Sequence, residues 1–447
     1  MRCFYLLALT ACSSLASQTK VPTPPKCWLN PLSSIVQLSS AERGIRVDND
    51  DGKPIESNEI LLRVPLSEII TPQMGREETP AGRAICKFTA NLDWHTALAI
   101  WICHAKANRE NLSELQKWYI DTIPWDSEAT NRIPLFWSID DLKELDGSPL
   151  LDQIFHKRAQ WEKLYEGIVN VYPPFAEETN LSELLQAKCL VASRAFRWKS
   201  DDIENGVAMI PLADMLNHQY SGVPTTCVWK VEDGDFVIRT SSELNAGSEA
   251  FQSYGKYANH HYLLKYGFCL EEEDHVQPAE AQIYLPSFGT SEEASTRIII
   301  SSLAEDFVEV LASLRLSEAK IDEEEQPIVG MKYRTPVSFQ NERKVLTRLL
   351  TSIETSLSQY PTTLQKDLEL LSAKRTASSG LYVPKFTNKR NAVVLRCGEK
   401  KMLYKWFKVC QACLDHLEKV EQGKASWKQY IDQMREGQDG FINRPIT

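Results

Sequence analysis

The sequence predicts an α+β protein in which a β-rich unit is interrupted by helices and followed by a C-terminal helical domain. Short apolar runs separated by turn residues occupy residues 26–75 and again 206–253. The stretch between them and the region after about 285 repeat apolar residues with the period of a helix. Because the two β-rich stretches flank the helical block, we expect them to meet in space and to carry that block as an insertion.

Residues 26–75 contain the apolar runs SSIVQL, GIRV and EILLRVP, and the turn residues DNDDGKP separate the last two, which predicts a small β unit. From about 76 to 200, the segments LDWHTALAIWICHAKA and SELQKWYIDTI place apolar residues three, four and seven positions apart, as amphipathic helices do. Two N-x-S sequons, at Asn111 and Asn180, both open the pattern NLSEL. This pattern is typical of a helix start, so we interpret both as caps rather than as glycosylation sites.

The second β-rich stretch contains the apolar run VAMIPLADML, the hairpin TCVWKVEDGDFVIRT with its turn at EDGD, and the run SEAFQSY. The segment ANHHYLLKYGF then predicts a short helix that ends at Gly267, a C-cap glycine. The C-terminal region opens with AQIYLP and a long amphipathic helix, TRIIISSLAEDFVEVLASL. The acidic stretch at 322–325 is the predicted linker, and further helices are expected from about 337 to about 434.

The composition is that of an ordinary globular protein, with 43% apolar and 25% charged residues among 447. At roughly 150 residues per domain, this length allows two or three domains. Lys and Arg total 50 against 60 Asp and Glu, so the net charge is −10 and general binding to nucleic acid is not expected. The 11 cysteines are scattered, which argues against a disulfide scaffold, and we interpret the pair Cys410 and Cys413 as buried helical thiols.

The N-terminus carries a separate signal. Arg2 precedes an apolar stretch from Cys3 to Cys12, and small residues follow up to Ala16. We interpret residues 1–16 as a signal or targeting segment for the secretory route, or for a plastid reached through it. The alternative is an apolar N-terminus on a cytoplasmic protein. The stretch is too short for a membrane span, which needs about 20 apolar residues, and we expect no association with a membrane.

The most informative segments are PLADMLNHQ (Pro211 to Gln219), FQSYG (Phe251 to Gly255) and LLKYGF (Leu263 to Phe268). Asn217 and His218 form a polar pair at the end of an apolar run, and Tyr254 ends the next hairpin beside a glycine. Polar groups at strand ends are where a ligand can meet backbone and side chains together. Each motif alone is more often a turn or a strand end, so only their joint occurrence in this order indicates a site.

This ordered set resembles the SET-domain methyltransferases, above all the subfamily containing Rubisco large-subunit lysine methyltransferase and actin-histidine methyltransferase. Further matching segments are RGI (Arg43 to Ile45), ILLRVP (Ile60 to Pro65), IPLFWSIDDLKEL (Ile133 to Leu145), SR (Ser193 and Arg194), YPTTLQKD (Tyr360 to Asp367) and LRCGEKKML (Leu395 to Leu403). The resemblance covers nearly the whole chain. It implies a split SET β-fold at 26–280 with a helical insertion at about 76–200, and an all-helical substrate-binding domain at 285–440.

The resemblance also implies a site for S-adenosylmethionine (SAM), with no metal. Its cofactor-binding residues would be Arg43, Gly44, Arg194, Asp214, Asn217, His218 and Tyr254. Arg194 would approach the carboxylate of the cofactor, and Asn217 and His218 would hold its methionyl amine and adenine. Tyr254 would also be the catalytic tyrosine, and Tyr266 would line the acceptor channel. Ala41 stands where some members have an acidic residue, so we leave this position out of the site.

These residue types suit methyl transfer to lysine. A sulfonium methyl is already activated, so alignment and desolvation are the main requirements. The lysine amine must first lose its proton, and an apolar channel beside a positive sulfonium lowers its pKa from about 10.4. Tyrosine hydroxyls can orient the neutral amine without competing as nucleophiles.

The implied function is therefore protein-lysine N-methylation of a non-histone substrate, since the Cys-rich zinc segment that follows many histone-type SET domains is absent. We expect a monomer that binds its protein substrate between the SET and helical domains. The alternatives are a protein-histidine N-methyltransferase and a non-catalytic SET-fold module that binds protein. The motifs leave the substrate and the number of methyl groups open.

Overall fold

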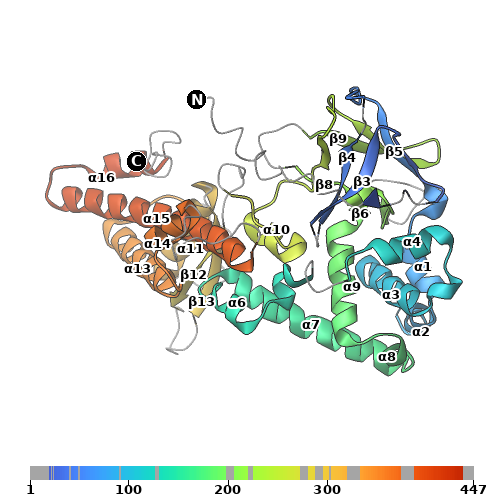
Figure 1. Cartoon of the computed structure of the whole chain (residues 1–447). Helices are drawn as coiled ribbons and strands as arrows, with labels where there is room; N and C mark the ends of the chain where they lie inside the picture. The colour runs from blue at the N-terminus through green and yellow to red at the C-terminus, as the bar shows by residue number, and fades with distance from the viewer. Residues whose placement is uncertain are drawn as a thin grey trace. The chain divides into compact units, whose positions relative to one another are not determined.

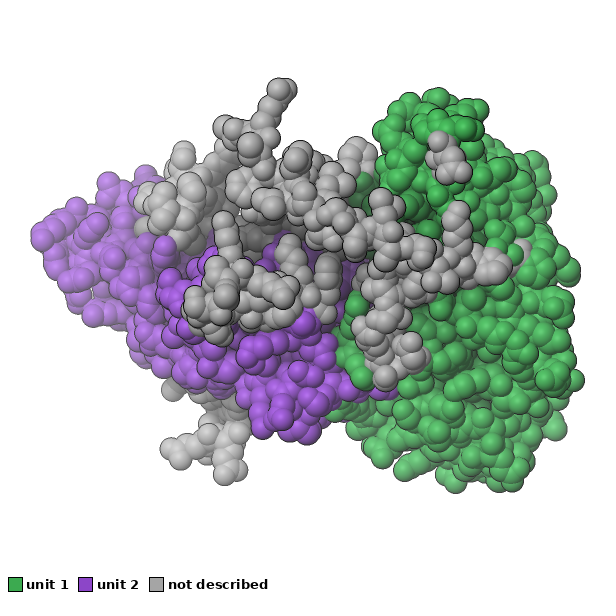
Figure 2. Space-filling view, in the orientation of Figure 1, with its two compact units in different colours: residues 1–133, 157–256 green, residues 134–156, 257–447 purple. Residues whose placement is uncertain are grey.

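The computed structural model of this chain describes residues 20–21, 23, 25–39, 42–48, 51–89, 92–125, 130–197, 206–219, 225–271, 280–286, 295–301, 304–319, 333–373 and 387–435. The chain forms two compact units (Figure 2): unit 1 comprises residues 1–133 and 157–256, and unit 2 comprises residues 134–156 and 257–447. The predicted targeting segment 1–16 and the predicted linker 322–325 lie outside the described residues. The domain limits predicted from motif order remain predictions.

The β part of unit 1 is built from both β-rich stretches of the sequence (Figure 1). Its strands are β1 (Lys20–Val21), β2 (Trp28–Leu29), β3 (Ser33–Ser39), β4 (Glu42–Val47), β5 (Ile60–Pro65), β6 (Phe196–Arg197), β7 (Val207–Ala208), β8 (Asn217–His218), β9 (Cys227–Glu232), β10 (Asp235–Thr240) and β11 (Glu249–Gln252). One sheet has the order β1-β3-β4-β11-β8, a second β2-β5-β10-β9, and β6 pairs with β7. Since β11 pairs with β4 and β10 with β5, the two stretches meet in space, which confirms the predicted split β unit.

The β core follows from alternation along these strands. Ile35 and Ile45 face each other across the β3–β4 pair, and both are buried together with Leu62, Phe236 and Ile238. The predicted hairpin between β9 and β10 turns through an Asp-Gly pair that has positive φ at both positions, 51° and 82°. Two such residues are what a tight hairpin turn requires, so the sequence determines this register locally.

The inserted helices of unit 1 are α1 (Pro72–Glu77), α2 (Pro80–Cys86), α3 (Trp94–Ala107), α4 (Glu114–Thr122), most of α7 (Pro149–Val171), α8 (Phe175–Glu178) and α9 (Leu181–Arg194). Unit 1 also contains the 3-10 turns η2 (Leu66–Glu68), η3 (Arg109–Asn111) and η6 (Ala213–Met215). Helix α3 is buried along most of its length and packs on α1 and α9. A side chain at Gly75 of α1 would collide with the carbonyl of Ala97, so only glycine allows this close helix crossing.

Both NLSEL segments begin helices, as predicted. Ser113 caps α4, where its side chain accepts from the amide of Gln116 and the Gln116 side chain accepts from the amide of Ser113. Asn180 caps α9 in the same reciprocal way with Glu183. Reciprocal pairs of this kind satisfy backbone donors that a helix start leaves open. The α9 cap matters for the site because Arg194 is the last residue of that helix.

Unit 2 is helical apart from one hairpin. Its elements are η4 (Pro134–Phe136), α6 (Ile139–Lys143), the start of α7, α10 (Asn259–Tyr266), β12 (Glu280–Pro286), β13 (Ser295–Ser301), α11 (Ala304–Glu318), α13 (Phe339–Ser358), α14 (Leu364–Ser372), α15 (Asn388–Glu421) and α16 (Trp427–Arg435). Helix α15 packs on α13 and α14 over a core that includes Leu346, Leu403 and Trp406. Cys410 and Cys413 are buried in α15, as predicted.

One predicted element is wrong. The segment TRIIISSLAEDFVEVLASL was expected to form a single helix, but its first part is strand β13, paired antiparallel with β12 from Glu280 opposite Ser301 to Pro286 opposite Ser295. Three consecutive β-branched isoleucines favour a strand, and the pairing with β12 decides the outcome. Helix α10 does end at Gly267, whose φ of 79° explains the glycine. In the described part of the chain, no helix has the length and apolar character of a membrane span.

Candidate active site

Strand β8 stands at the edge of its sheet and brings most of the predicted site residues together in unit 1. It pairs parallel with β11, with Asn217 opposite Phe251 and His218 opposite Gln252. On its other side β11 pairs with β4, the strand that carries Arg43 and Gly44. Thus the predicted motifs of β4, β8 and the end of β11 share one sheet, although about two hundred residues of sequence separate the first from the last.

The Asn217 side chain connects these three strands. Its Nδ2 donates to the carbonyl of Arg43 at 2.8 Å and to Oε1 of Glu249 at 2.7 Å. Glu249 opens β11, so one amide group links β4, β8 and β11. Such bonds fix the backbone of Arg43 and Gly44 beside Asn217, as a site lined by main chain requires.

A second connected group lies at the end of α9 and is the Asp214 cluster: Tyr119, Asp214 and Arg194. The guanidinium Nη1 of Arg194 donates to both the backbone oxygen and Oδ2 of Asp214, each at 3.1 Å. The Tyr119 hydroxyl donates to the same Oδ2 at 2.9 Å. Tyr119 is completely buried on α4, and the Asp214 side chain is 1% exposed, whereas 23% of the Arg194 side chain remains exposed.

Burial and charge oppose each other in the Asp214 cluster. Burial raises the pKa of Asp214, while Arg194 and the bond from Tyr119 act in the opposite direction. Burial also raises the pKa of Tyr119 well above its ordinary value, so its hydroxyl stays a proton donor. Burial is the largest influence on Arg194 and disfavours its charge, but Asp214, Tyr119 and Tyr254 together outweigh it and raise the pKa of Arg194. The ion pair is therefore retained in a mostly dry environment.

Asp214 has unused hydrogen-bonding capacity. Its Oδ1 is buried and has no partner among the described residues, whereas Oδ2 receives both Tyr119 and Arg194. A buried carboxylate oxygen is normally bonded, because leaving it bare costs free energy. The backbone strain next to it points the same way, since Leu212, just before η6, has a φ of 71° that a leucine rarely adopts. An acceptor and a partly exposed guanidinium thus lie side by side, which fits the ammonium and carboxylate of an amino-acid group.

Tyr254 is held by His218 and by the turn before β8. Its amide donates to Nδ1 of His218 at 3.0 Å, and the two rings stack with centroids 5.1 Å apart at 23°. Burial lowers the pKa of His218, which keeps the imidazole neutral so that Nδ1 can accept this bond. The Tyr254 hydroxyl donates to the carbonyl of Leu216 at 3.0 Å. The chain then reverses at Gly255, whose φ of 112° favours glycine.

Tyr266, the predicted channel residue, belongs to unit 2 and ends helix α10. Within that unit its ring centroid lies 6.2 Å from that of Tyr262 and 6.0 Å from that of Phe268, and the Lys265 amine lies over its face. Its assignment to the acceptor channel stays a prediction.

Two polar residues of the site were not predicted. Tyr119 lies in a segment whose apolar period indicated only a helix, and nothing in the sequence links it to Asp214, 95 positions later. Glu249 lies in the run SEAFQSY, where it appeared to be one polar residue of an alternating strand. A local signal exists only for Glu249, because its position two residues before Phe251 places it on the strand that pairs with β8.

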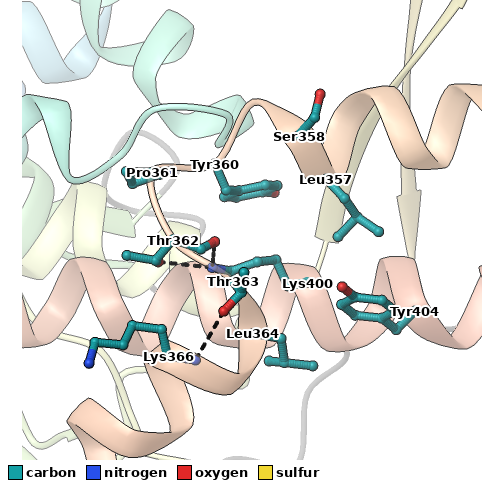
Figure 3. A pocket seen from close by; sticks show the side chains of 10 residues that line it. All are labelled: Leu357, Ser358, Tyr360, Pro361, Thr362, Thr363, Leu364, Lys366, Lys400 and Tyr404. Atoms are coloured by element: carbon teal, nitrogen blue, oxygen red, sulfur yellow. Dashed lines mark hydrogen bonds between the residues drawn. The ribbon is translucent and has the colours of Figure 1, made fainter.

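Unit 2 contains a surface hollow of about 480 Å³ between the α13–α14 turn and α15 (Figure 3). Its polar groups serve the fold: the Lys400 amine donates to the carbonyl and hydroxyl of Thr362 at 2.7 and 3.2 Å, and Thr363 caps α14. We assign this hollow no part in the chemistry. Among the described residues no group of three or more His, Cys, Asp or Glu side chains is arranged to hold a metal.

Comparison with known proteins finds similarity over most of the chain. Residues 288–403 match the family model described as Rubisco LSMT substrate-binding. The actin-histidine N-methyltransferase of Papio anubis is 23% identical over 90% of this chain and 69% of its own length. The chloroplastic fructose-bisphosphate aldolase lysine N-methyltransferase of Arabidopsis thaliana is 24% identical over 48% of this chain and 44% of its own length. The chain therefore spans about two thirds of one relative and less than half of the other.

A solved structure shares the fold. The crystal structure of the SET domain of LSMT bound to methyl-lysine and S-adenosylhomocysteine matches with a TM-score of 0.69 at 20% identity, covering 93% of this chain and 95% of that one. The match extends over both β-rich stretches, the inserted helices and the C-terminal helical region, and it confirms the predicted fold class. In sequence and in fold, the chain thus resembles the SET-domain protein methyltransferases of the subfamily that contains Rubisco large-subunit and actin-histidine methyltransferases.

Proposed function

We propose that this protein transfers a methyl group from SAM to the side-chain amine of a lysine in a non-histone protein substrate. SAM-dependent protein methylation is the activity of the subfamily, and the lysine acceptor is the finer part of the proposal. The observation that supports it most is the hydrogen-bonded site of unit 1, in which Asn217 links three strands while Asp214 presents a free acceptor beside Arg194.

The residues present fit SAM. Arg194 would hold its carboxylate, because a guanidinium binds carboxylate strongly where water is partly excluded. The bare Oδ1 of Asp214 and the main chain around Asn217 would receive its ammonium, and Arg43, Gly44 and His218 would line it mainly with backbone. When bound, SAM supplies a methyl group on a sulfonium centre that is already activated for transfer.

Tyr254 would act at the reacting centre as an acceptor rather than as an acid. Its proton is directed at the carbonyl of Leu216, so the hydroxyl offers acceptor lone pairs rather than a proton to a group at the reacting centre. An oxygen with this orientation can accept from a neutral amine and make weak CH···O contacts to a polarised methyl group. The stacked His218 and the bond to the Tyr254 amide hold the ring in place, which is the alignment that methyl transfer needs.

Histidine is the second candidate acceptor. The actin-histidine N-methyltransferase of Papio anubis spans 90% of this chain, whereas the lysine N-methyltransferase of Arabidopsis thaliana spans 48%. The cofactor residues described above serve either acceptor equally, because they contact only the donor. Mass spectrometry of a methylated substrate distinguishes the two by locating the methyl group on lysine or on histidine.

The test of the site is the change Tyr254→Phe. We expect it to leave the affinity for SAM within about twofold and to lower turnover by roughly 100-fold, because only alignment at the reacting centre is lost. Tyr165→Phe is the matched control, since the Tyr165 hydroxyl also donates to a backbone carbonyl of unit 1, that of Thr179, at 3.1 Å. Unchanged turnover in Tyr254→Phe would remove this residue from the proposed role.

Two expectations from the sequence remain proposals. The substrate would be a protein that contacts both the SET unit and the substrate-binding domain, and the enzyme would work as a monomer. Residues 1–16 would direct the protein to the secretory route or to a plastid, and removal of this segment from a fluorescent fusion should then leave the fusion in the cytoplasm.

A further inference from the structure

We infer that Tyr119 is a positioning residue for the cofactor: by occupying Oδ2 of Asp214 it keeps Oδ1 open and holds Arg194 in a one-oxygen contact, so that both groups can receive the amino-acid end of SAM. This inference rests on the proposed function, because it concerns the same cofactor site. It adds a residue of the inserted helices to a site that the motifs confined to α9 and the strands.

The inference is drawn first from the hydrogen bonds around Asp214. Oδ2 accepts from the Tyr119 hydroxyl at 2.9 Å and from Arg194 Nη1 at 3.1 Å, while Nη1 also donates to the Asp214 backbone oxygen. The guanidinium therefore approaches from the backbone side with one nitrogen. Oδ1 faces no donor among the described residues, although it is buried. Two donors thus share one oxygen of the carboxylate while the other is left open.

Unit 2 shows what the same three groups do when no acceptor is left open. In the Glu342 cluster, defined as Tyr430, Glu342 and Arg315, the guanidinium contacts both carboxylate oxygens at 2.6 Å through Nε and Nη2. The Tyr430 hydroxyl donates to Oε1 at 2.8 Å, and all three side chains are completely buried. This two-oxygen contact is the arrangement that an arginine and a carboxylate favour when nothing prevents it.

Loss of the Tyr119 hydroxyl should therefore have a specific consequence. Without that donor, Asp214 is free to rotate and Arg194 can contact both of its oxygens, as Arg315 does with Glu342. The acceptor for the ammonium and the exposed part of the guanidinium would then both be lost to the cofactor. Phenylalanine fills nearly the same volume as tyrosine, so the helical core around position 119 should stay packed.

The pH dependence gives a second signature. Burial raises the pKa of Asp214, and the groups that face it, Arg194 and Tyr119, both lower that pKa. Removing the Tyr119 hydroxyl takes away one of these groups, but the two-oxygen contact with Arg194 replaces it, so the pKa of Asp214 should change little. The ratio of the two affinities, wild type to variant, should consequently be the same at pH 8 and at pH 6.

The experiment is a calorimetric titration of the full chain with sinefungin, a stable analogue of SAM, at pH 8 and pH 6. Tyr119→Phe should bind roughly tenfold more weakly than the wild type at both pH 8 and pH 6. Tyr430→Phe is the matched control, because it removes the same phenol–carboxylate bond from the Glu342 cluster. It should bind sinefungin like the wild type at both pH values.

A double-mutant cycle separates positioning from a merely structural role. If Tyr119 acts through Asp214, then Tyr119→Phe should cost little further affinity in an Asp214→Asn background, whereas an effect on packing alone would add in full. Equal binding by the wild type and Tyr119→Phe at both pH values would overturn the inference, as would full additivity. No binding of sinefungin by the wild type would instead overturn the proposed cofactor site, so the two failures are distinguishable.

Discussion

The Asp214 cluster of unit 1 and the Glu342 cluster of unit 2 contain the same three groups in two different states. In the Glu342 cluster, Arg315 uses three nitrogens, two for the carboxylate and one for the carbonyl of Tyr333, and every member is buried. In the Asp214 cluster, the bonds from Arg194 to Asp214 use one nitrogen, 23% of the arginine side chain stays exposed, and one carboxylate oxygen has no partner among the described residues.

This difference shows how to separate a structural ion pair from one that belongs to a site. A buried pair whose hydrogen bonds are all satisfied stabilises the unit and has nothing left for a ligand. A pair that leaves a buried acceptor without a hydrogen bond lowers the stability of the folded state. Such a loss of stability is expected where a bound ligand would supply the missing hydrogen bond. Each cluster combines a phenol, a carboxylate and a guanidinium, so the bonding pattern is what assigns their roles.

The largest expected effect comes from breaking the Glu342 cluster. Arg315→Met leaves a buried carboxylate without its charge partner, which should lower the free energy of unfolding by about 3–5 kcal/mol. Affinity for SAM should not change. Denaturation in urea measures the loss. The control is Arg343→Met, one residue after Glu342 on α13, whose partner Glu421 on α15 is exposed, and we expect a change within about 0.5 kcal/mol. A loss no greater than the control would show that the Glu342 cluster is not structural.

The corresponding change in the Asp214 cluster should reduce the affinity for SAM strongly and the free energy of unfolding less. Arg194→Met removes the guanidinium proposed to bind the cofactor carboxylate, and we expect about a 100-fold loss of affinity, or roughly 2.7 kcal/mol. The free energy of unfolding should fall less than in Arg315→Met, because the Arg194 side chain is partly exposed whereas the Arg315 side chain is completely buried. Calorimetry and denaturation on the same sample measure both quantities. Unchanged affinity combined with a large loss of stability would reverse the assignment of the two clusters.

Glu399 extends the comparison to a carboxylate bonded by neutral donors. Ser148 and Tyr360 donate to its two oxygens at 2.7 and 3.0 Å, and burial raises its pKa from 4.5 to about 8. The folded state therefore binds a proton that the unfolded state releases between these two pKa values, so the free energy of unfolding should fall as the pH rises. We expect a decline of about 3.5 kcal/mol between pH 5 and pH 8 that Glu399→Gln largely abolishes.

Denaturation at several pH values tests this expectation. Glu369→Gln is the control, because the Glu369 carboxylate lies on the surface of α14, half-exposed beside Lys366. Its pH profile should match that of the wild type. An equally steep decline in Glu399→Gln would assign the pH dependence to another group.

The features that could be predicted from the sequence are those determined by residues close to one another along the chain. The Asp-Gly turn of the β9–β10 hairpin, the caps at Ser113 and Asn180 and the glycine that ends α10 each depend on neighbouring residues. Asn217, His218 and Tyr254 stand out for a similar reason, because each ends an apolar run within a few residues. Their meeting in one sheet required only that the two β-rich stretches pair.

What could not be predicted depends on contacts between distant segments. The strand β13 has an apolar pattern that suits a helix as well, and only its pairing with β12 decides between the two. Tyr119 could not be linked to Asp214, since a tyrosine on an amphipathic helix indicates core packing and nothing more. The open Oδ1 of Asp214 is likewise invisible in the sequence, because a tyrosine, a carboxylate and an arginine also form the closed Glu342 cluster.

The most direct test of the central claim is transfer of a labelled methyl group from SAM to a protein. Purified wild type and Tyr254→Phe would each be incubated with SAM carrying a deuterated methyl group and an extract of host-cell proteins, and modified peptides would be located by mass spectrometry. The account predicts label on a lysine with the wild type and almost none with the variant, although both bind SAM. Equal labelling by the two proteins, or none by a wild type that binds SAM, would contradict it.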